Sequence, residues 1–237
     1  MPSHNINGHE IHFERYGQGE PLLLLHSFLC NTEMWRPQID TLAANYTVIV
    51  MDIRGHGKSS PSSSHSMYDL VSDAIKLLDA EGIERATWLG LSIGGMISMR
   101  AALTHPERVS KLVLLATDAK SESLLVKIER RLLAQVVKRF GVGPVVIPVL
   151  RKMFGKSTFR GRKELIKIWK PKFLEVHTES MLKTLQTLLT RDDVSENLQS
   201  LRIPTLIIHG QEDRAIPVSL GHALSAQMDD AKLVIVE

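Results

Sequence analysis

The sequence predicts an α/β protein in which helices cover both faces of a mostly parallel central sheet. Near-continuous apolar runs of strand length alternate with segments of helical spacing, which is typical of strands buried on both faces. The 237 residues are enough for one large α/β unit with a substantial core. Between about Lys120 and Thr190 this alternation stops, and helical patterns without strands indicate an inserted helical lid over the sheet edge.

The expected elements follow in chain order. An initial hairpin is expected between Ile6 and Tyr16. Strands are expected at residues 22–26, 46–51, 87–90, 111–115, 205–209 and 232–236, and helices at 33–44, 67–81, 95–104 and 218–227. We therefore expect residues 1–119 and 191–237 to form the core domain and residues 120–190 to form the lid.

Composition limits the class of protein. Cys30 is the single cysteine, so no internal disulfide is possible and a reducing cytoplasm fits. The first residues lack a signal-peptide pattern, and no apolar run approaches the roughly 20 residues of a membrane-spanning helix. The histidines show no metal-ligand spacing. We expect a cytoplasmic protein without a metal or a cofactor.

The pentapeptide Gly90-Leu91-Ser92-Ile93-Gly94 has the form of a nucleophile elbow. It follows an apolar run and opens into a helix-like stretch, which is the strand–turn–helix context that this pattern requires. The flanking glycines allow strand and helix to pack closely around a strained middle residue. We expect the Ser92 hydroxyl to stand clear at the sheet edge, beside the positive end of a helix.

A serine nucleophile also needs oxyanion donors and an acid. The strand at 22–26 ends in a tight turn, so the N–H groups of Phe28 and Ile93 are candidate oxyanion donors; an ordinary strand-to-loop junction is the alternative. Asp213 lies just past a strand end, where α/β sheets place catalytic groups. Asp213 could instead cap the following helix. Glu212 and Asp118 are weaker rivals.

Taken together, these motifs resemble those of the α/β-hydrolase-fold serine hydrolases, along essentially the whole chain. The resemblance rests on His26-Ser27-Phe28, Asp52-Ile53-Arg54-Gly55-His56-Gly57-Lys58-Ser59, Gly90-Leu91-Ser92-Ile93-Gly94-Gly95 and Gly210-Gln211-Glu212-Asp213. It is closest to the branch of 3-oxoadipate enol-lactone hydrolases and small esterases. It implies the α/β-hydrolase fold, a structural role for His56, and cleavage of a carboxylic ester or lactone of a small to medium acid through an acyl-enzyme on Ser92, without a cofactor.

Two positions depart from the family pattern. Ser27 stands where a glycine is usual, which is tolerable if its φ is not positive. The family's catalytic histidine follows the last strand, and here only Glu237 follows that strand. We therefore assign no catalytic histidine: His26 is expected to hold the oxyanion turn, and His222 to be a solvated or packed helix residue. A continuation of the natural chain beyond Glu237 is the favoured explanation. The alternative is a catalytically inactive relative that binds a small molecule or a protein partner.

The segment 120–172 is strongly basic. It holds 15 Lys/Arg and 3 Asp/Glu, a net charge of +12 within a chain of net charge +3. Its helical apolar positions are Leu124, Leu125, Ile128, Leu132, Val136 and Phe140, and basic residues including Lys127, Arg130, Arg131, Lys138 and Arg139 fill the intervals. Residues 142–150 are apolar with two prolines, which suits a kinked segment lining a pocket.

Three interpretations of the basic helix are open. The favoured one packs its apolar stripe on the core and leaves its charges solvated. In the second, the charges attract anionic ester or lactone substrates. The third, least favoured, is contact with an anionic membrane surface. Nucleic-acid binding is not expected, because no base-stacking aromatics are interleaved with the charges. The sequence leaves the oligomeric state open.

Overall fold

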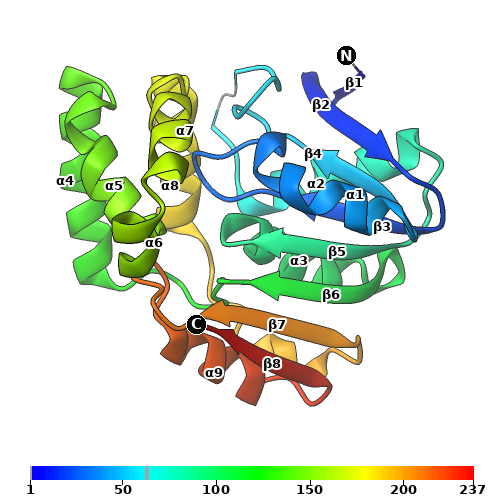
Figure 1. Ribbon diagram of the computed structural model, residues 1–237. Helices are drawn as coiled ribbons and strands as arrows, with labels where there is room; N and C mark the ends of the chain where they lie inside the picture. The colour runs from blue at the N-terminus through cyan, green and yellow to red at the C-terminus, as the bar shows by residue number, and fades with distance from the viewer. Residues whose placement is uncertain (1, 62–63) are drawn as a thin grey trace.

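An eight-stranded, mostly parallel sheet forms the centre of the computed structural model, which describes residues 2–61 and 64–237 (Figure 1). The strand order is β1-β2-β4-β3-β5-β6-β7-β8; β1 and β2 are antiparallel, β2 is antiparallel to β4, and all further neighbours are parallel. The strands are β1 (Ser3–Ile6), β2 (His9–Tyr16), β3 (Glu20–Leu25), β4 (Tyr46–Met51), β5 (Ala86–Leu91), β6 (Val109–Leu115), β7 (Thr205–Gly210) and β8 (Ala231–Val236). The predicted mostly parallel sheet is confirmed.

Helices cover both faces of this sheet. The α-helices are α1 (Arg36–Ala43), α2 (Met67–Ala80), α3 (Ile93–Thr104), α4 (Leu124–Phe140), α5 (Val146–Met153), α6 (Lys156–Gly161), α7 (Lys163–Leu174), α8 (Thr178–Thr190) and α9 (Val218–Ala226). The 3₁₀ turns are η1 (Thr32–Trp35), η2 (Pro106–Arg108), η3 (Gly143–Val145) and η4 (Glu196–Ser200).

The alternation within β3 shows why the central strands read as continuous apolar runs. Leu23 and Leu25 belong to the large core that the sheet forms with α2, α3 and α9. Leu22 and Leu24 belong to the cluster on the opposite face, where α1 packs. Successive side chains of a strand point to opposite faces, and here both faces are covered, so every position is apolar.

The local differences from the prediction have simple causes. The hairpin β1–β2 turns at Asn7 and Gly8, which both have positive φ, as a two-residue turn of this hand requires. The helix expected at 33–44 begins as the 3₁₀ turn η1, and α1 follows with Pro37 in its first turn, where the missing N–H costs no hydrogen bond.

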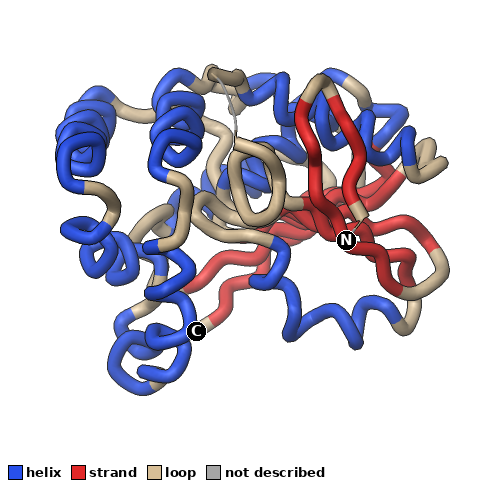
Figure 2. Tube along the Cα trace, turned by 90° about the horizontal axis from the view of Figure 1, so that it is seen from above, coloured by secondary structure: helices blue, strands red, loops and turns tan. Residues whose placement is uncertain are grey.

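Helices α4 to α8 lie together at the carboxyl ends of the parallel strands (Figure 1). Seen from above, they occupy one end of the molecule, beside the strands rather than over their faces (Figure 2). Residues 120–190 are all described and contain no strand, as the sequence predicts. Their role as a lid stays a proposal.

The favoured packing of α4 is wrong. The six apolar positions expected to meet the core are the exposed ones: Leu124, Leu125, Ile128, Leu132, Val136 and Phe140. The buried side of α4 is instead formed by Val126, Leu133 and Val137. Because α4 carries apolar residues around most of its circumference, its periodicity alone does not say which side faces inward.

An apolar groove lies on the α1 side of the sheet, over the half formed by β6, β7 and β8. It has a volume of about 630 Å³ and is lined by Leu89, Val113 and Leu206 among others. None of the predicted site residues lies in it. The groove therefore plays no part in the site described next.

Candidate active site

Ser92 forms the turn between β5 and α3. Its φ of +54° and ψ of −114° are strained values for a residue with a side chain. Two hydrogen bonds hold the turn: the Ser92 N–H donates to the Leu115 carbonyl at 2.9 Å, and the Thr117 hydroxyl donates to the Ser92 carbonyl at 2.7 Å. The sequence prediction of a sharp strand–turn–helix bend at Ser92 agrees with this geometry.

The flanking glycines are required by close backbone approach. A Cβ on Gly90 would lie 2.2 Å from the Gly94 carbonyl carbon, and a Cβ on Gly94 would lie 2.3 Å from the Leu25 carbonyl oxygen. Both obstacles are backbone atoms, which cannot turn aside as a side chain can. The glycines therefore allow α3 to begin directly against β3 and β5.

Ser92 opens into a cavity of about 650 Å³ between the strand ends and the helical segment 120–190. Phe28 and Asp213 line the same cavity, so three of the four predicted site residues meet there. The far wall is largely apolar and comes from α4, α5 and α8; it includes Val137, Val146 and Leu188. The Ser92 hydroxyl forms no hydrogen bond within residues 2–61 and 64–237.

The two predicted oxyanion donors have amides without partners in the described part of the chain. Phe28 lies in the turn after β3, and its N–H forms no backbone hydrogen bond there. Ile93 is the first residue of α3, where an N–H has no partner within the helix. The Ile93 side chain is fully buried and does not line the cavity, so only its backbone is available.

His26 holds the turn that carries Phe28, as the sequence predicts. Its Nδ1 lies 2.7 Å from the Ser27 carbonyl, and its Nε2 accepts the Ile53 N–H at 3.0 Å. These partners fix the tautomer with the proton on Nδ1. Complete burial lowers the pKa of His26 to about 4, which keeps the ring neutral. Ser27 is not among the residues with positive φ, so the serine fits where glycine is usual.

Asp213 is oriented by the backbone of its own loop. Its Oδ1 accepts the N–H groups of Ala215 at 2.8 Å and Ile216 at 2.9 Å. Its Oδ2 accepts no hydrogen bond among the described residues and lies 3.8 Å from His209 Nε2. Burial raises the pKa of Asp213, and the two amide bonds oppose that rise. The helix-cap alternative is wrong, because both bonds end before α9 begins at Val218.

His209 holds the loop that follows Asp213 through a hydrogen bond to the backbone. It is fully buried, its Nε2 donates to the Ile216 carbonyl at 2.7 Å, and its Nδ1 has no hydrogen-bond partner among the described residues. A Cβ on Gly221 would lie 2.7 Å from that Nδ1, so α9 packs directly on the ring. His209 supports the loop and has no access to Ser92.

The rival acids have other partners. Glu212 points away from the cavity and accepts the Ser157 N–H and hydroxyl at 2.9 and 2.5 Å, and these bonds lower its pKa. Asp118 does line the cavity, but it faces Arg191 at 3.7 Å and accepts the Lys120 N–H at 3.1 Å. Burial raises the pKa of Asp118. Asp213 lines the cavity with one oxygen free of hydrogen bonds, and it forms no ion pair with a lysine or arginine of the described residues.

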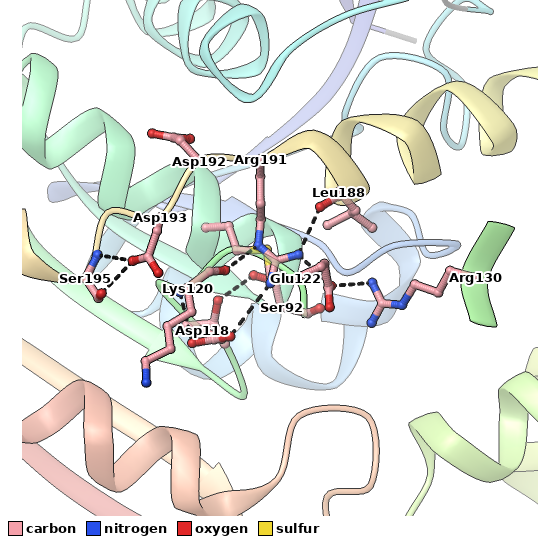
Figure 3. Close-up of polar contacts among 12 residues, drawn as sticks. Ser92, Asp118, Lys120, Glu122, Arg130, Leu188, Arg191, Asp192, Asp193 and Ser195 are labelled. Atoms are coloured by element: carbon pink, nitrogen blue, oxygen red, sulfur yellow. Dashed lines mark hydrogen bonds and ion pairs between the residues drawn. The ribbon is translucent and has the colours of Figure 1, made fainter. Parts of the chain in front are cut away.

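The sequence did not predict a polar cluster at the cavity wall (Figure 3). Arg191 and Arg130 both donate to Glu122 at 2.5 Å, and Arg191 Nε also donates to the Lys120 carbonyl at 2.9 Å. Arg130 was expected among solvated charges; it is instead half-buried and paired. Glu122 and Arg191 stand 69 residues apart, so no local pattern could have joined them.

None of the described residues that line the cavity is a histidine. His26 and His209 are fully buried, and His222 is exposed on α9, as expected. The end of β8 lies against the Asp213 loop, because the Gln211 N–H donates to the Val236 carbonyl at 2.7 Å.

Comparison with known proteins gives consistent results. The family model described as alpha/beta hydrolase fold matches residues 20–141. A pimeloyl-[acyl-carrier protein] methyl ester esterase of Vibrio parahaemolyticus is 30% identical over 92% of this chain and 86% of its own length. A 3-oxoadipate enol-lactonase 2 of Acinetobacter baylyi is 28% identical over 96% of this chain and 85% of its own. The crystal structure of the enol-lactonase from Burkholderia xenovorans LB400 superposes with a TM-score of 0.93 at 24% identity, covering 100% of this chain and 91% of that one.

Proposed function

The chain belongs to the alpha/beta hydrolase fold family, and we propose that it hydrolyses a carboxylic ester or lactone of a small to medium acid through an acyl-enzyme on Ser92. The observation that carries this proposal is the unbonded Ser92 hydroxyl on a strained turn, in one cavity with Asp213. A hydrolytic role is supported by the names of the relatives, a methyl ester esterase and an enol-lactonase. Both names describe cleavage of an acyl–oxygen bond.

The proposed reaction has two halves. Ser92 Oγ attacks the acyl carbon, and the carbonyl oxygen becomes an oxyanion that the Phe28 and Ile93 N–H groups stabilise. Each such donor contributes roughly 10²- to 10³-fold in rate. The acyl–oxygen bond breaks and the alcohol leaves with the serine proton. Water then attacks the acyl-enzyme, which releases the acid and restores the hydroxyl.

A general base completes the proposal. Asp213 Oδ2 is free to accept the Nδ1–H of an imidazole, and the orientation of Asp213 by two amides suits that task. The proposal assigns no residue to this base, because none of the described residues that line the cavity is a histidine.

The proposed substrate is anionic. Arg130, Lys152 and Arg191 on the cavity wall are already paired with glutamates. The wall's other two cations, Lys120 and Arg214, form no ion pair within the described ranges. A carboxylate on the acyl group would be met by these two side chains. A volume of about 650 Å³ suits a ligand of small to medium size.

A fluorophosphonate probe, which reacts with activated serines, tests the assignment of Ser92 as the nucleophile. We expect the adduct to map to Ser92 by peptide mass spectrometry and to be absent from Ser92→Ala. Asp213→Asn should slow labelling by about 10⁴-fold, as removal of an orienting acid does. Glu212→Gln is the matched control, because this neighbouring carboxylate lies outside the cavity.

The outcomes separate the two candidate functions. A folded protein that fails to label, or that labels equally in Ser92→Ala, contradicts the hydrolase. Failure to label together with saturable binding of an ester would instead favour the catalytically inactive, ligand-binding relative.

A further inference from the structure

The outer side of α4 is an apolar surface open to solvent. The exposed fractions are 80% for Leu125, 70% for Leu124, and 65% for Leu132 and Phe140. Ile128 and Val136 complete this α4 stripe (Leu124, Leu125, Ile128, Leu132, Val136 and Phe140). Leu124, Ile128, Leu132, Val136 and Phe140 repeat every four residues, so they lie along one side of the helix, whereas scattered exposed apolar residues would need no explanation.

Cations border the α4 stripe. Arg131, Lys138 and Arg139 are exposed on the same helix, and Arg139 lies over the Phe140 ring at 5.6 Å. Arg131 and Lys138 form no ion pair with any described residue, whereas the helix's own Glu129 pairs with Lys152. The segment from 120 to 172 adds to this field with its net charge of +12. The patch is therefore apolar at its centre and positive at its border.

The helix stands at the outer edge of the molecule, on the far side of the helical group from the sheet (Figure 1). Its opposite side lines the cavity through Val126, Leu133 and Val137. At 17 residues, α4 is about 25 Å long. None of the helices in the described ranges is long and apolar enough to cross a membrane.

We propose that α4 docks in the plane of an anionic lipid surface, with the α4 stripe buried in the interface and Arg131, Lys138 and Arg139 against the headgroups. A helix with a large apolar face, a basic border and no capacity to span is the form that binds interfaces. The highly exposed leucines of the α4 stripe can insert between lipid headgroups, which move apart to admit them. Docking would also bring one wall of the cavity to the membrane.

A second copy of the chain is a poorer occupant. Symmetric pairing of two α4 helices would place the same patch on both sides of the interface, and therefore bring like charges together. Arg131 and Lys138 would face their equivalents with no acidic residue free on the helix to compensate, since Glu129 is already paired. Lipid phosphates supply that missing negative charge.

Co-sedimentation with lipid vesicles tests the proposal on the full chain. We expect binding to vesicles of phosphatidylcholine mixed with phosphatidylglycerol, and little binding to phosphatidylcholine alone. The double variant Arg131→Gln/Lys138→Gln should weaken the partition about 25-fold, at about fivefold per cation. Leu125→Ser/Leu132→Ser should weaken it at least as much, because each buried leucine contributes more than a cation.

The control and the contrary outcomes are distinct. Arg202→Gln removes an exposed cation at the amino end of β7, far from α4, and should leave binding unchanged. All these side chains are exposed, and unchanged melting curves would verify that the variants fold. No sedimentation with anionic vesicles, equal binding to neutral ones, or concentration-dependent dimers abolished by Leu125→Ser/Leu132→Ser without vesicle binding would each overturn the proposal. So would equally tight, leucine-dependent binding to soluble polyglutamate, which would indicate an acidic protein partner.

Discussion

Arg191 and Glu122 join the two ends of the helical segment 120–190 through an ion pair of 2.5 Å at the cavity wall. Arg191 is buried and Glu122 is mostly shielded from solvent, and Arg130 from α4 donates to the same carboxylate oxygen. The Glu122 carboxylate therefore connects the start of this segment with Arg130 in its first helix and with Arg191 directly after its last helix.

Glu122→Gln should destabilise the protein by about 3 kcal/mol, because it removes the ion-pair partner of Arg130 and leaves Arg191 with only the more distant Asp118. The free energy of unfolding from urea titration measures the effect. Glu129→Gln is the matched control: its pair with Lys152 is exposed, so the loss should stay below about 1 kcal/mol. Equal effects of the two substitutions would contradict the structural role of Glu122.

Gly94→Ala should destabilise the protein by about 1–3 kcal/mol, because the new Cβ meets the backbone of Leu25 and forces α3 away from β3. Gly161→Ala offers the comparison. Gly161 ends α6, and a Cβ there meets nothing within 4 Å. We expect this second change to be neutral or stabilising by less than about 1 kcal/mol. Thermal unfolding of both variants distinguishes them.

Stability should fall between about pH 6.5 and pH 4 through His26. Burial lowers the pKa of His26 to about 4, below its ordinary 6.5. The unfolded chain therefore binds a proton in that window and the folded chain does not, so the stabilisation is present above pH 6.5 and is lost as the pH falls. The full effect is about 3 kcal/mol.

The physical cause lies in the hydrogen bonds of His26. A second proton would place Nε2–H against the Ile53 N–H, two donors with no acceptor between them. Urea unfolding at a series of pH values gives the free energy of unfolding at each pH. Between pH 6.5 and pH 4 this free energy should fall less steeply in His26→Gln than in the original protein. An unchanged slope would assign the acid sensitivity to other groups, such as His56, whose pKa burial lowers to about 3.

Added salt should lower kcat/KM for anionic substrates more than for neutral ones. If Lys120, Arg214 and the basic segment attract a carboxylate, kcat/KM for a carboxylate-bearing ester should fall roughly tenfold as the added salt rises. A neutral ester of the same alcohol should show little change. If kcat/KM falls equally for the two esters, electrostatic attraction does not contribute to the choice of substrate.

Several features of this protein were predictable from the chain alone. The apolar runs predicted β3 to β8 to within about two residues at each end, because strands covered on both faces need apolar side chains at every position. The first strand of the hairpin, β1, begins three residues before the expected start at Ile6. The pentapeptide around Ser92 predicted the bend, because only glycine on both sides permits the close approach seen at Gly90 and Gly94. The position of Asp213 followed from its place after β7.

The sequence by itself determined the sheet, the bend at Ser92 and the loop that carries Asp213, since each depends on residues close together in the chain. Only the tertiary structure decided which side of α4 turns inward, which oxygen of Asp213 stays free, and that Glu122 meets Arg191. These three outcomes depend on which surfaces meet when distant segments pack. The spacing of apolar residues shows that a helix has a side to bury. Which side is buried depends on the shape and charge of the surface that the helix packs against.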